Sequence, residues 1–192
     1  MRWNPCVRAA LTIALAAAAH AGVGSPTTAC LSTNTTTGAT GELDSHVPTI
    51  TPDGLVAAFA SSAPDLVPGD TNGRRDIFIV DLVTGARTRA SVSTSGLQAN
   101  GHSYLPSLSN NGRFVAFETS ATTRGGVGSG GSGSKVYWRD QVSGDTVLVA
   151  GASSPIVASA PDISASGRYV AYARGNLPFY CYVRNMQSGD VV

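Results

Sequence analysis

The sequence predicts an all-β fold built from repeated four-stranded antiparallel sheets. Two linked motifs recur three times in the same order, and no segment beyond the N-terminal leader shows convincing helical periodicity. The composition agrees with this fold class. A chain of 192 residues with 22 Gly, 10 Pro and only 13% charged residues suits a globular protein rich in strands and turns.

The first motif begins at a proline and ends in a short apolar stretch. Its three copies are "PTITPDGLVAAFAS" (48–61), "PSLSNNGRFVAFET" (106–119) and "PDISASGRYVAYAR" (161–174). The prolines lie 58 and 55 residues apart, a spacing that indicates stacked supersecondary units.

The second motif follows each copy of the first. It reads "IFIVDLVTG" (77–85), "VYWRDQVSG" (136–144) and "YVRNMQSG" (182–189). In each copy, strand-forming residues lead to Asp or Asn, two variable residues and then Ser/Thr-Gly. Since glycine accepts the positive φ of a tight turn, the closing pair predicts a hairpin between two strands.

Each repeat therefore reads as four short strands. A brief first strand and an x-Gly turn lead into a second strand whose apolar residues face both ways, with Phe114 and Ala116 on one face and Val115 and Phe117 on the other. A strand that is apolar on both faces is expected to be covered on both faces. The third strand runs to the Asp or Asn, and the fourth alternates as an outer edge strand should.

Four-stranded units at this spacing are the blades of a β-propeller. The predicted blades span residues 44–101, 102–156 and 157–192, and the third breaks off as its fourth strand should begin. The chain is thus predicted to form an incomplete propeller of two full blades and a partial third. Because closed propellers have four to eight blades, we expect either further blades in a longer gene product or self-association, and we favour the longer gene product because the sequence stops inside a repeat.

The segments "SNNGRFVAFET" and "SASGRYVAYAR", each followed by a strand and Asp/Asn-x-x-Ser/Thr-Gly, resemble the TolB-like, WD-like propeller repeat of exported bacterial proteins. The resemblance covers about residues 44–192 and is specific for fold. It implies either a protein-interaction module or a propeller attached to a peptidase or lyase. It carries over no catalytic residues, because the family has none in common.

Residues 1–21 have the layout of a secretory signal peptide. Two arginines precede the apolar stretch of residues 9–19, and Ala19-His20-Ala21 fits the small-x-small pattern of a signal-peptide cleavage site. The apolar stretch is too short to span a bilayer, and a short buried helix is the alternative. The sequence therefore predicts export to the periplasm, the cell surface or the medium, with residues 22–43 as a flexible Thr/Ser/Gly-rich lead-in.

Export changes the interpretation of the cysteines. Cys30 and Cys181 remain beyond the leader, and two thiols in an oxidising compartment are able to pair. The sequence leaves this pairing open. Lipidation of Cys30 is disfavoured, because "TTAC" (27–30) lacks the usual leucine three residues earlier.

The charge balance of the chain argues against nucleic-acid binding. Thirteen basic residues are matched by twelve acidic ones, so the chain has no excess of positive charge to attract nucleic acid.

The main candidate site is a calcium loop formed by Asp70, Asn72 and Asp76. Calcium takes six to eight oxygen ligands, often from short acidic loops. The alternative is a turn, because Asn72-Gly73 is a strong hairpin signal and Asp70 can bond to nearby backbone N–H groups. No further acid follows in the position that a full calcium loop requires.

Other chemical motifs are weaker. The tract "GVGSGG" (126–131) fits G-x-G-x-x-G but lacks the flanking strand and helix of a dinucleotide site, so no cofactor is expected. His102-Ser103 suggests a hydrolase only by adjacency, without a nucleophile elbow, and His46 and His102 form no metal-ligand cluster.

The sequence thus favours an exported, non-enzymatic propeller that presents loops to a protein partner. The alternatives are an accessory propeller of a secreted hydrolase or lyase, whose catalytic part lies outside this chain, and a calcium-stabilised cell-surface module.

Overall fold

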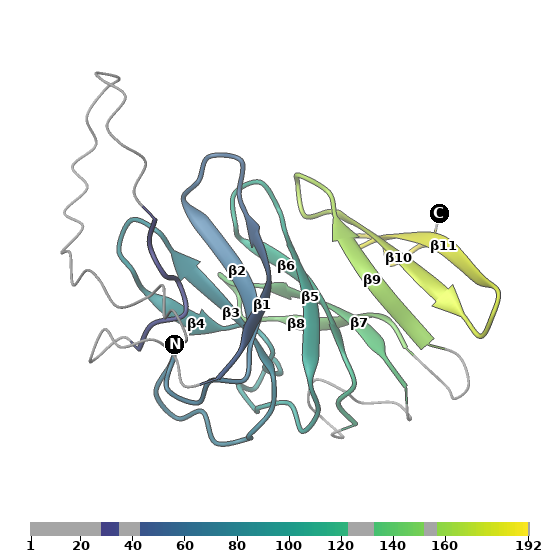
Figure 1. Cartoon of the computed structure of the whole chain (residues 1–192). Helices are drawn as coiled ribbons and strands as arrows, with labels where there is room; N and C mark the ends of the chain where they lie inside the picture. The colour runs from purple at the N-terminus through teal and green to yellow at the C-terminus, as the bar shows by residue number, and fades with distance from the viewer. Residues whose placement is uncertain (1–27, 35–42, 123–132, 152–156, 192) are drawn as a thin grey trace.

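The computed structural model describes residues 28–34, 43–122, 133–151 and 157–191. Every regular element in these ranges is a strand (Figure 1). The strands are β1 (Ser45–Ile50), β2 (Val56–Ser61), β3 (Asp76–Asp81), β4 (Arg87–Arg89), β5 (Ser103–Leu108), β6 (Phe114–Thr119), β7 (Lys135–Asp140), β8 (Thr146–Ala150), β9 (Val157–Ile163), β10 (Tyr169–Gly175) and β11 (Phe179–Asn185). None of the described residues forms a helix that could cross a membrane.

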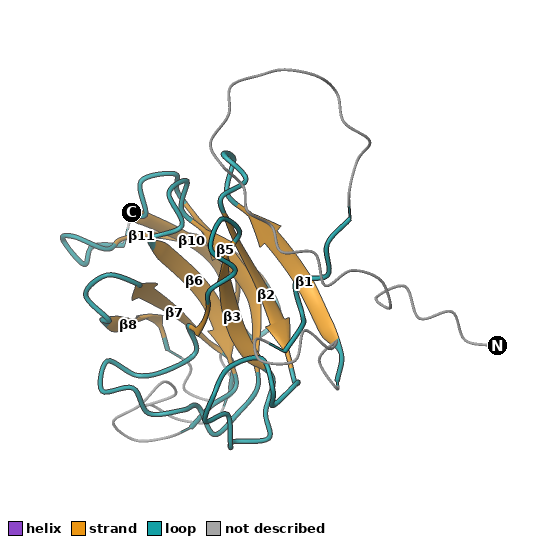
Figure 2. Cartoon of the chain, turned by 90° about the vertical axis from the view of Figure 1, so that its left-hand side faces the viewer, coloured by secondary structure: helices purple, strands orange, loops and turns teal. Residues whose placement is uncertain are grey.

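The strands form three antiparallel sheets of consecutive strands. The orders are β1-β2-β3-β4, β5-β6-β7-β8 and β9-β10-β11. We call these sheets blade 1, blade 2 and blade 3. They stack side by side, with blade 2 between the other two and the first strands β1, β5 and β9 adjacent (Figures 1 and 2). The predicted all-β fold of two full propeller blades and a partial third is confirmed.

The second strand of blade 2 is buried on both faces, as its sequence predicts. Val115 and Phe117 belong to the apolar core between blades 1 and 2, whereas Phe114 and Ala116 pack in the core between blades 2 and 3. Burial between two sheets removes apolar area from water on both sides of this strand, which favours radial stacking.

The Asp/Asn-x-x-Ser/Thr-Gly motif forms the turn between the third and fourth strands. In blade 1, the Asp81 Oδ1 accepts hydrogen bonds from the backbone N–H groups of Val83 (2.9 Å) and Thr84 (2.8 Å). Asp140 and Asn185 cap the matching turns of blades 2 and 3. The motif glycine, such as Gly85 (φ 74°), supplies the left-handed backbone that closes the turn.

Arginines tie each later blade to the one before it. The Arg139 Nη1 of blade 2 lies 3.5 Å from the carbonyl oxygens of Val92 and Ser93, just beyond the fourth strand of blade 1. The matching Arg184 of blade 3 donates to the carbonyls of Leu148 (2.9 Å) and Val149 (2.6 Å) on β8. These bonds give the stacked sheets a fixed relative position.

Blade 1 has Val80 at the position of these arginines. Val80 packs with Phe59 and Phe78 in a third apolar cluster, which Leu31 of the N-terminal segment helps to cover. The Arg87 Nε donates to the Leu31 carbonyl (3.1 Å). Residues 28–34, within the expected lead-in, thus pack against the outer half of blade 1. The predicted signal peptide lies outside the described residues.

Candidate functional site

The three residues of the predicted calcium loop lie near one another at one end of blade 1. Asp70 and Asn72 belong to the loop between β2 and β3, and Asp76 begins β3. The Asn72 Nδ2 donates to the Asp76 Oδ2 (2.8 Å) and to the Ala99 carbonyl (3.1 Å). The Asn72 Oδ1 accepts the Arg74 N–H (2.9 Å), which makes this part of the loop an Asx turn.

An arginine on β4 supplies the positive charge of this cluster. The Arg89 Nη1 lies 3.1 Å from the Asp70 Oδ1 and 3.3 Å from the Asp76 Oδ2. The same nitrogen donates to the Gln98 Oε1 (2.8 Å). All three charged side chains are almost fully buried. We call Asp70, Asn72, Asp76, Arg89 and Gln98 the loop-end network.

Burial and pairing shift the pKa values of the Asp70 and Asp76 carboxyl groups in opposite directions. Burial raises the pKa of Asp76 above its ordinary value, although hydrogen bonds from Ser91 and Asn72 and the charge of Arg89 oppose the shift. Burial likewise raises the pKa of Asp70, and Arg89 again opposes it. Because a buried charge is costly without a partner, Arg89 favours the ionised form of both carboxyl groups, and the hydrogen bonds from Ser91 and Asn72 favour it further at Asp76.

The network is built to hold the loops in place. It joins the β2–β3 loop, β3, β4 and the connection from blade 1 to blade 2 through buried, charge-assisted hydrogen bonds. Within the described ranges, no group of three or more His, Cys, Asp or Glu side chains is arranged to hold a metal ion. Calcium at Asp70, Asn72 and Asp76 stays a prediction, and Arg89 is the residue with which the ion would compete.

His102 lies beside this network at the junction of blades 1 and 2. Its Nδ1 accepts the backbone N–H of Arg75 (3.0 Å), and the Arg75 guanidinium lies over the Tyr104 ring at 5.3 Å. Partial burial, and then the charges of Arg74 and Arg75, lower the pKa of His102. The imidazole is therefore a neutral acceptor in an inter-blade contact. Ser103 is buried and its hydroxyl donates to Thr119, so the adjacent pair serves packing.

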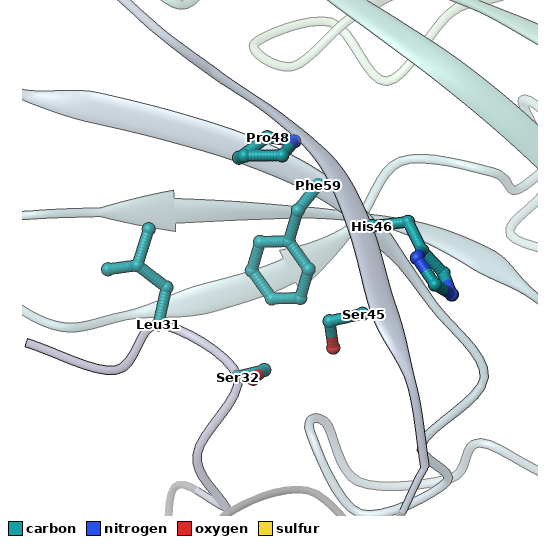
Figure 3. A pocket seen from close by; sticks show the side chains of 6 residues that line it. All are labelled: Leu31, Ser32, Ser45, His46, Pro48 and Phe59. Carbon is teal, nitrogen blue, oxygen red and sulfur yellow. The ribbon is translucent and has the colours of Figure 1, made fainter. Parts of the chain in front are cut away.

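His46 borders a pocket on the other side of blade 1. The pocket has a volume of about 210 Å³ and is lined by Leu31, Ser32, Ser45, His46, Pro48 and Phe59. Its floor is the Phe59 ring, and the His46 imidazole points away from that ring (Figure 3). The volume is below the usual range of ligand sites, so the pocket is a packing gap beneath the N-terminal segment.

The hairpin between β10 and β11 carries an exposed apolar tip. Leu177 is 82% and Tyr180 is 59% exposed, and Phe179 beside them is also exposed. We call these three residues the blade 3 tip. Blade 3 has a short loop here, and no described residue covers the Phe179 and Tyr180 rings fully. The short length of this loop is a sequence signal that could have identified the surface.

The two cysteines beyond the predicted leader lie in different parts of the fold. Cys181 is exposed on β11 of blade 3, whereas Cys30 lies beside blade 1 with its Sγ 3.6 Å from the Ser32 Oγ. The Gly-rich tract at 126–131 lies outside the described residues.

Solved structures support the propeller fold. The chain resembles the β-propeller domain of the Trilobed protease from Pyrococcus furiosus, with a TM-score of 0.52, 13% identity, and coverage of 78% of this chain and 41% of that one. A structure from a study of two prolyl endopeptidases matches with a TM-score of 0.53, 12% identity, and coverage of 78% and 21%. TolB from Acinetobacter baumannii gives a TM-score of 0.37 at 16% identity over 78% and 43%, which is too low to add to the fold assignment.

The chain thus spans less than half of each of these proteins. No protein-family profile matches it. No curated protein matches it by sequence. The comparisons therefore establish the β-propeller fold and leave the activity to argument from the residues.

Proposed function

We propose that this chain is the non-enzymatic propeller part of an exported protein and that it binds a protein partner through its loops. The observation that carries the proposal is the blade 3 tip, where three large apolar side chains are exposed next to one another in the chain. Exposed apolar groups of this kind are typical of protein-binding surfaces, and Tyr is among the residues that contribute most to such interfaces.

The loop-end network supports the same function. Buried bonds from Arg89 and Asn72 hold the blade 1 loop before any partner arrives. A loop that is ordered in advance loses less conformational entropy on binding. The mechanism is surface complementarity without bond chemistry. Two observations agree with a mechanism of this kind. Asp70 and Asp76 pair with Arg89, and His102 accepts a hydrogen bond from the backbone.

The experiment compares three forms of the protein in capture from the envelope and medium fractions of the source organism. The forms are the wild type, a Phe179→Ser/Tyr180→Ser variant, and a Val142→Ser control that changes an exposed residue on the distant β7–β8 turn. A partner that the wild type and the control retain and the tip variant loses supports the proposal. Equal recovery of every protein by all three forms contradicts it.

An accessory propeller of a secreted hydrolase is the second candidate. The observation in its favour is that a protease contains a propeller domain similar in fold to this chain. The reading frame downstream of codon 192 separates the two candidates. A catalytic α/β segment with a nucleophile elbow favours the hydrolase, whereas further blades followed by a stop codon favour the binding module.

A further inference from the structure

Two consecutive arginines lie on the β2–β3 loop of blade 1, at its junction with blade 2. Arg74 is exposed and Arg75 is half-buried. The Arg75 backbone is bonded to blade 2, because its N–H donates to the His102 Nδ1 (3.0 Å) and its carbonyl accepts the Ser103 N–H (2.7 Å). Both arginine side chains therefore project from a backbone segment that the neighbouring blade holds in place.

The Arg75 guanidinium is held against an aromatic ring. It lies over Tyr104 of β5, with its Cζ 5.3 Å from the ring centroid. A tyrosine ring attracts a cation over its face, and a planar guanidinium can stack in this way while its edge still donates hydrogen bonds. The Arg75 Nε is buried and has no hydrogen-bond partner among the described residues. The group is therefore positioned without being satisfied.

Most other arginines of the described ranges are already engaged. Six of them donate side-chain hydrogen bonds to oxygen atoms of the protein: Arg87, Arg89, Arg113, Arg139, Arg168 and Arg184. The Arg74 and Arg75 guanidinium groups make no such bond and no ion pair with a described residue. Arg174 of blade 3 is also without one, but no second arginine adjoins it in the sequence.

The carboxylates around this arginine pair are directed elsewhere. Asp76, which follows Arg75 in the chain, pairs with Arg89 (3.3 Å). The Glu118 Oε2 accepts the backbone N–H of Ala160 (3.4 Å) on blade 3. Two positive charges are thus left without a carboxylate among the described residues at the junction of blades 1 and 2.

We propose that Arg74 and Arg75 bind an acidic segment of the protein partner. The fork of a guanidinium matches the two oxygens of a carboxylate. Nucleic acids and anionic membranes fit less well, because they are bound by larger groups of basic residues and this chain has 13 basic and 12 acidic residues. The inference rests on the proposed function in that the ligand is a protein, and it names the chemistry of a second contact.

The first test selects ligands without assuming their sequence. A library of short random peptides displayed on phage is panned on the purified wild type and on an Arg74→Gln/Arg75→Gln variant. The wild type should enrich peptides that are rich in Asp and Glu, and the variant should not, because complementary charge determines which partners are accepted. The absence of acidic enrichment, or the same enrichment by both proteins, overturns the inference.

The second test measures the affinity for a selected acidic peptide by fluorescence anisotropy. Arg75→Gln should weaken binding by about 10- to 100-fold, as expected for the loss of a hydrogen bond between charged groups. Arg74→Gln should weaken it less, because solvent screens an exposed pair. Raising the salt concentration from ~0.05 M to ~0.5 M should weaken binding to the wild type.

Arg168→Gln is the matched control for these variants. Its guanidinium also lies 5.3 Å from a tyrosine ring, that of Tyr169, but on the turn between β9 and β10. Its peptide affinity should equal that of the wild type, and a loss as large as that of Arg75→Gln contradicts a specific site. Circular dichroism checks folding, and Arg74→Gln carries the same test if Arg75→Gln unfolds, because the Arg74 side chain is exposed.

Two further probes separate a carboxylate site from a phosphate site. Vesicles that contain phosphatidylglycerol and a single-stranded DNA oligonucleotide are offered to the wild type and to Arg75→Gln. Binding of either probe that Arg75→Gln abolishes assigns the site to phosphate and overturns the inference. The capture experiment on the blade 3 tip is read separately: a partner that the tip variant loses and the double arginine variant retains in full leaves the proposed function standing and removes this inference.

Discussion

The ring of Phe114 occupies the space where a side chain at residue 167 would project, so Gly167 receives the neighbouring blade. Phe114 also stacks on Trp138, with ring centroids 4.9 Å apart, and the Trp138 Nε1 donates to the Gly167 carbonyl at 2.9 Å. One glycine therefore combines close packing with a hydrogen bond between blades 2 and 3.

Replacing Gly167 should destabilise the fold far more than replacing a glycine of similar backbone angle elsewhere. Gly167→Ala introduces a methyl group into the Phe114 ring and strains a backbone with φ 75°, at an expected cost of about 2–4 kcal/mol. Gly85→Ala is the matched control: its φ is 74°, no described atom lies within 4 Å of the added group, and only the strain of about 1 kcal/mol is expected. Denaturant unfolding measures both values. Equal costs would show that packing against Phe114 contributes nothing.

The ion pair of Arg113 and Asp140 should make stability depend on pH at the acid end. Arg113 donates to both carboxylate oxygens, at 2.9 and 2.7 Å, and lowers the pKa of Asp140 to about 2. A carboxyl group whose pKa is lower in the folded state stabilises the fold above the unfolded value of 3.8, and this contribution is lost as the pH falls towards 2.

Asp140→Asn isolates this ion pair, because asparagine can still cap the turn as Asn185 does in blade 3. We expect the variant to melt slightly below the wild type at pH 7, since Arg113 is half exposed and solvent weakens the pair. The two melting temperatures should converge near pH 2. A difference that persists at that pH indicates a role for Asp140 other than the ion pair.

Arg89 should decide whether the loop-end network responds to calcium. With Arg89 in place, the guanidinium already pairs with Asp70 and Asp76 and offsets one of their two charges, so millimolar calcium should raise the melting temperature little. Arg89→Met removes that charge from two buried carboxylates and should lower the free energy of unfolding by about 3–5 kcal/mol. Calcium should then restore part of the loss. Thermal melts with calcium and with chelator measure both effects, and a large calcium shift in the wild type would instead establish the predicted calcium site.

The inner strands contain a repeated site of backbone strain. Val47, Leu105 and Ala160 precede the three motif prolines and have positive φ values of 50–51°, at shifts in the strand register. Ala160→Gly should therefore raise the free energy of unfolding by up to about 1 kcal/mol, because glycine adopts this conformation without strain. Ala165→Gly, at an exposed turn residue without positive φ, should lower it. Destabilisation by both substitutions would show that Ala160 makes a contact that outweighs the strain.

Much of this fold could be predicted because its determinants are local. The two-faced apolar strand around Val115 and the turn motif ending at Gly144 each carry their own signal within about ten residues. The pairing of Asp70 with Arg89 could not be predicted, because it depends on how two loops and two strands meet. The same is true of Arg139, whose partners lie on another blade, and of Tyr180, whose exposure depends on what covers a short loop.

The double-mutant cycle between Phe114 and Gly167 tests most directly the central claim that neighbouring blades pack face to face through these turns. Phe114→Ala removes the ring that an alanine at 167 would meet, so Gly167→Ala should cost at least ~1 kcal/mol less in the Phe114→Ala background than in the wild type. Equal costs in the two backgrounds would contradict the account, because they would show that the two residues do not touch.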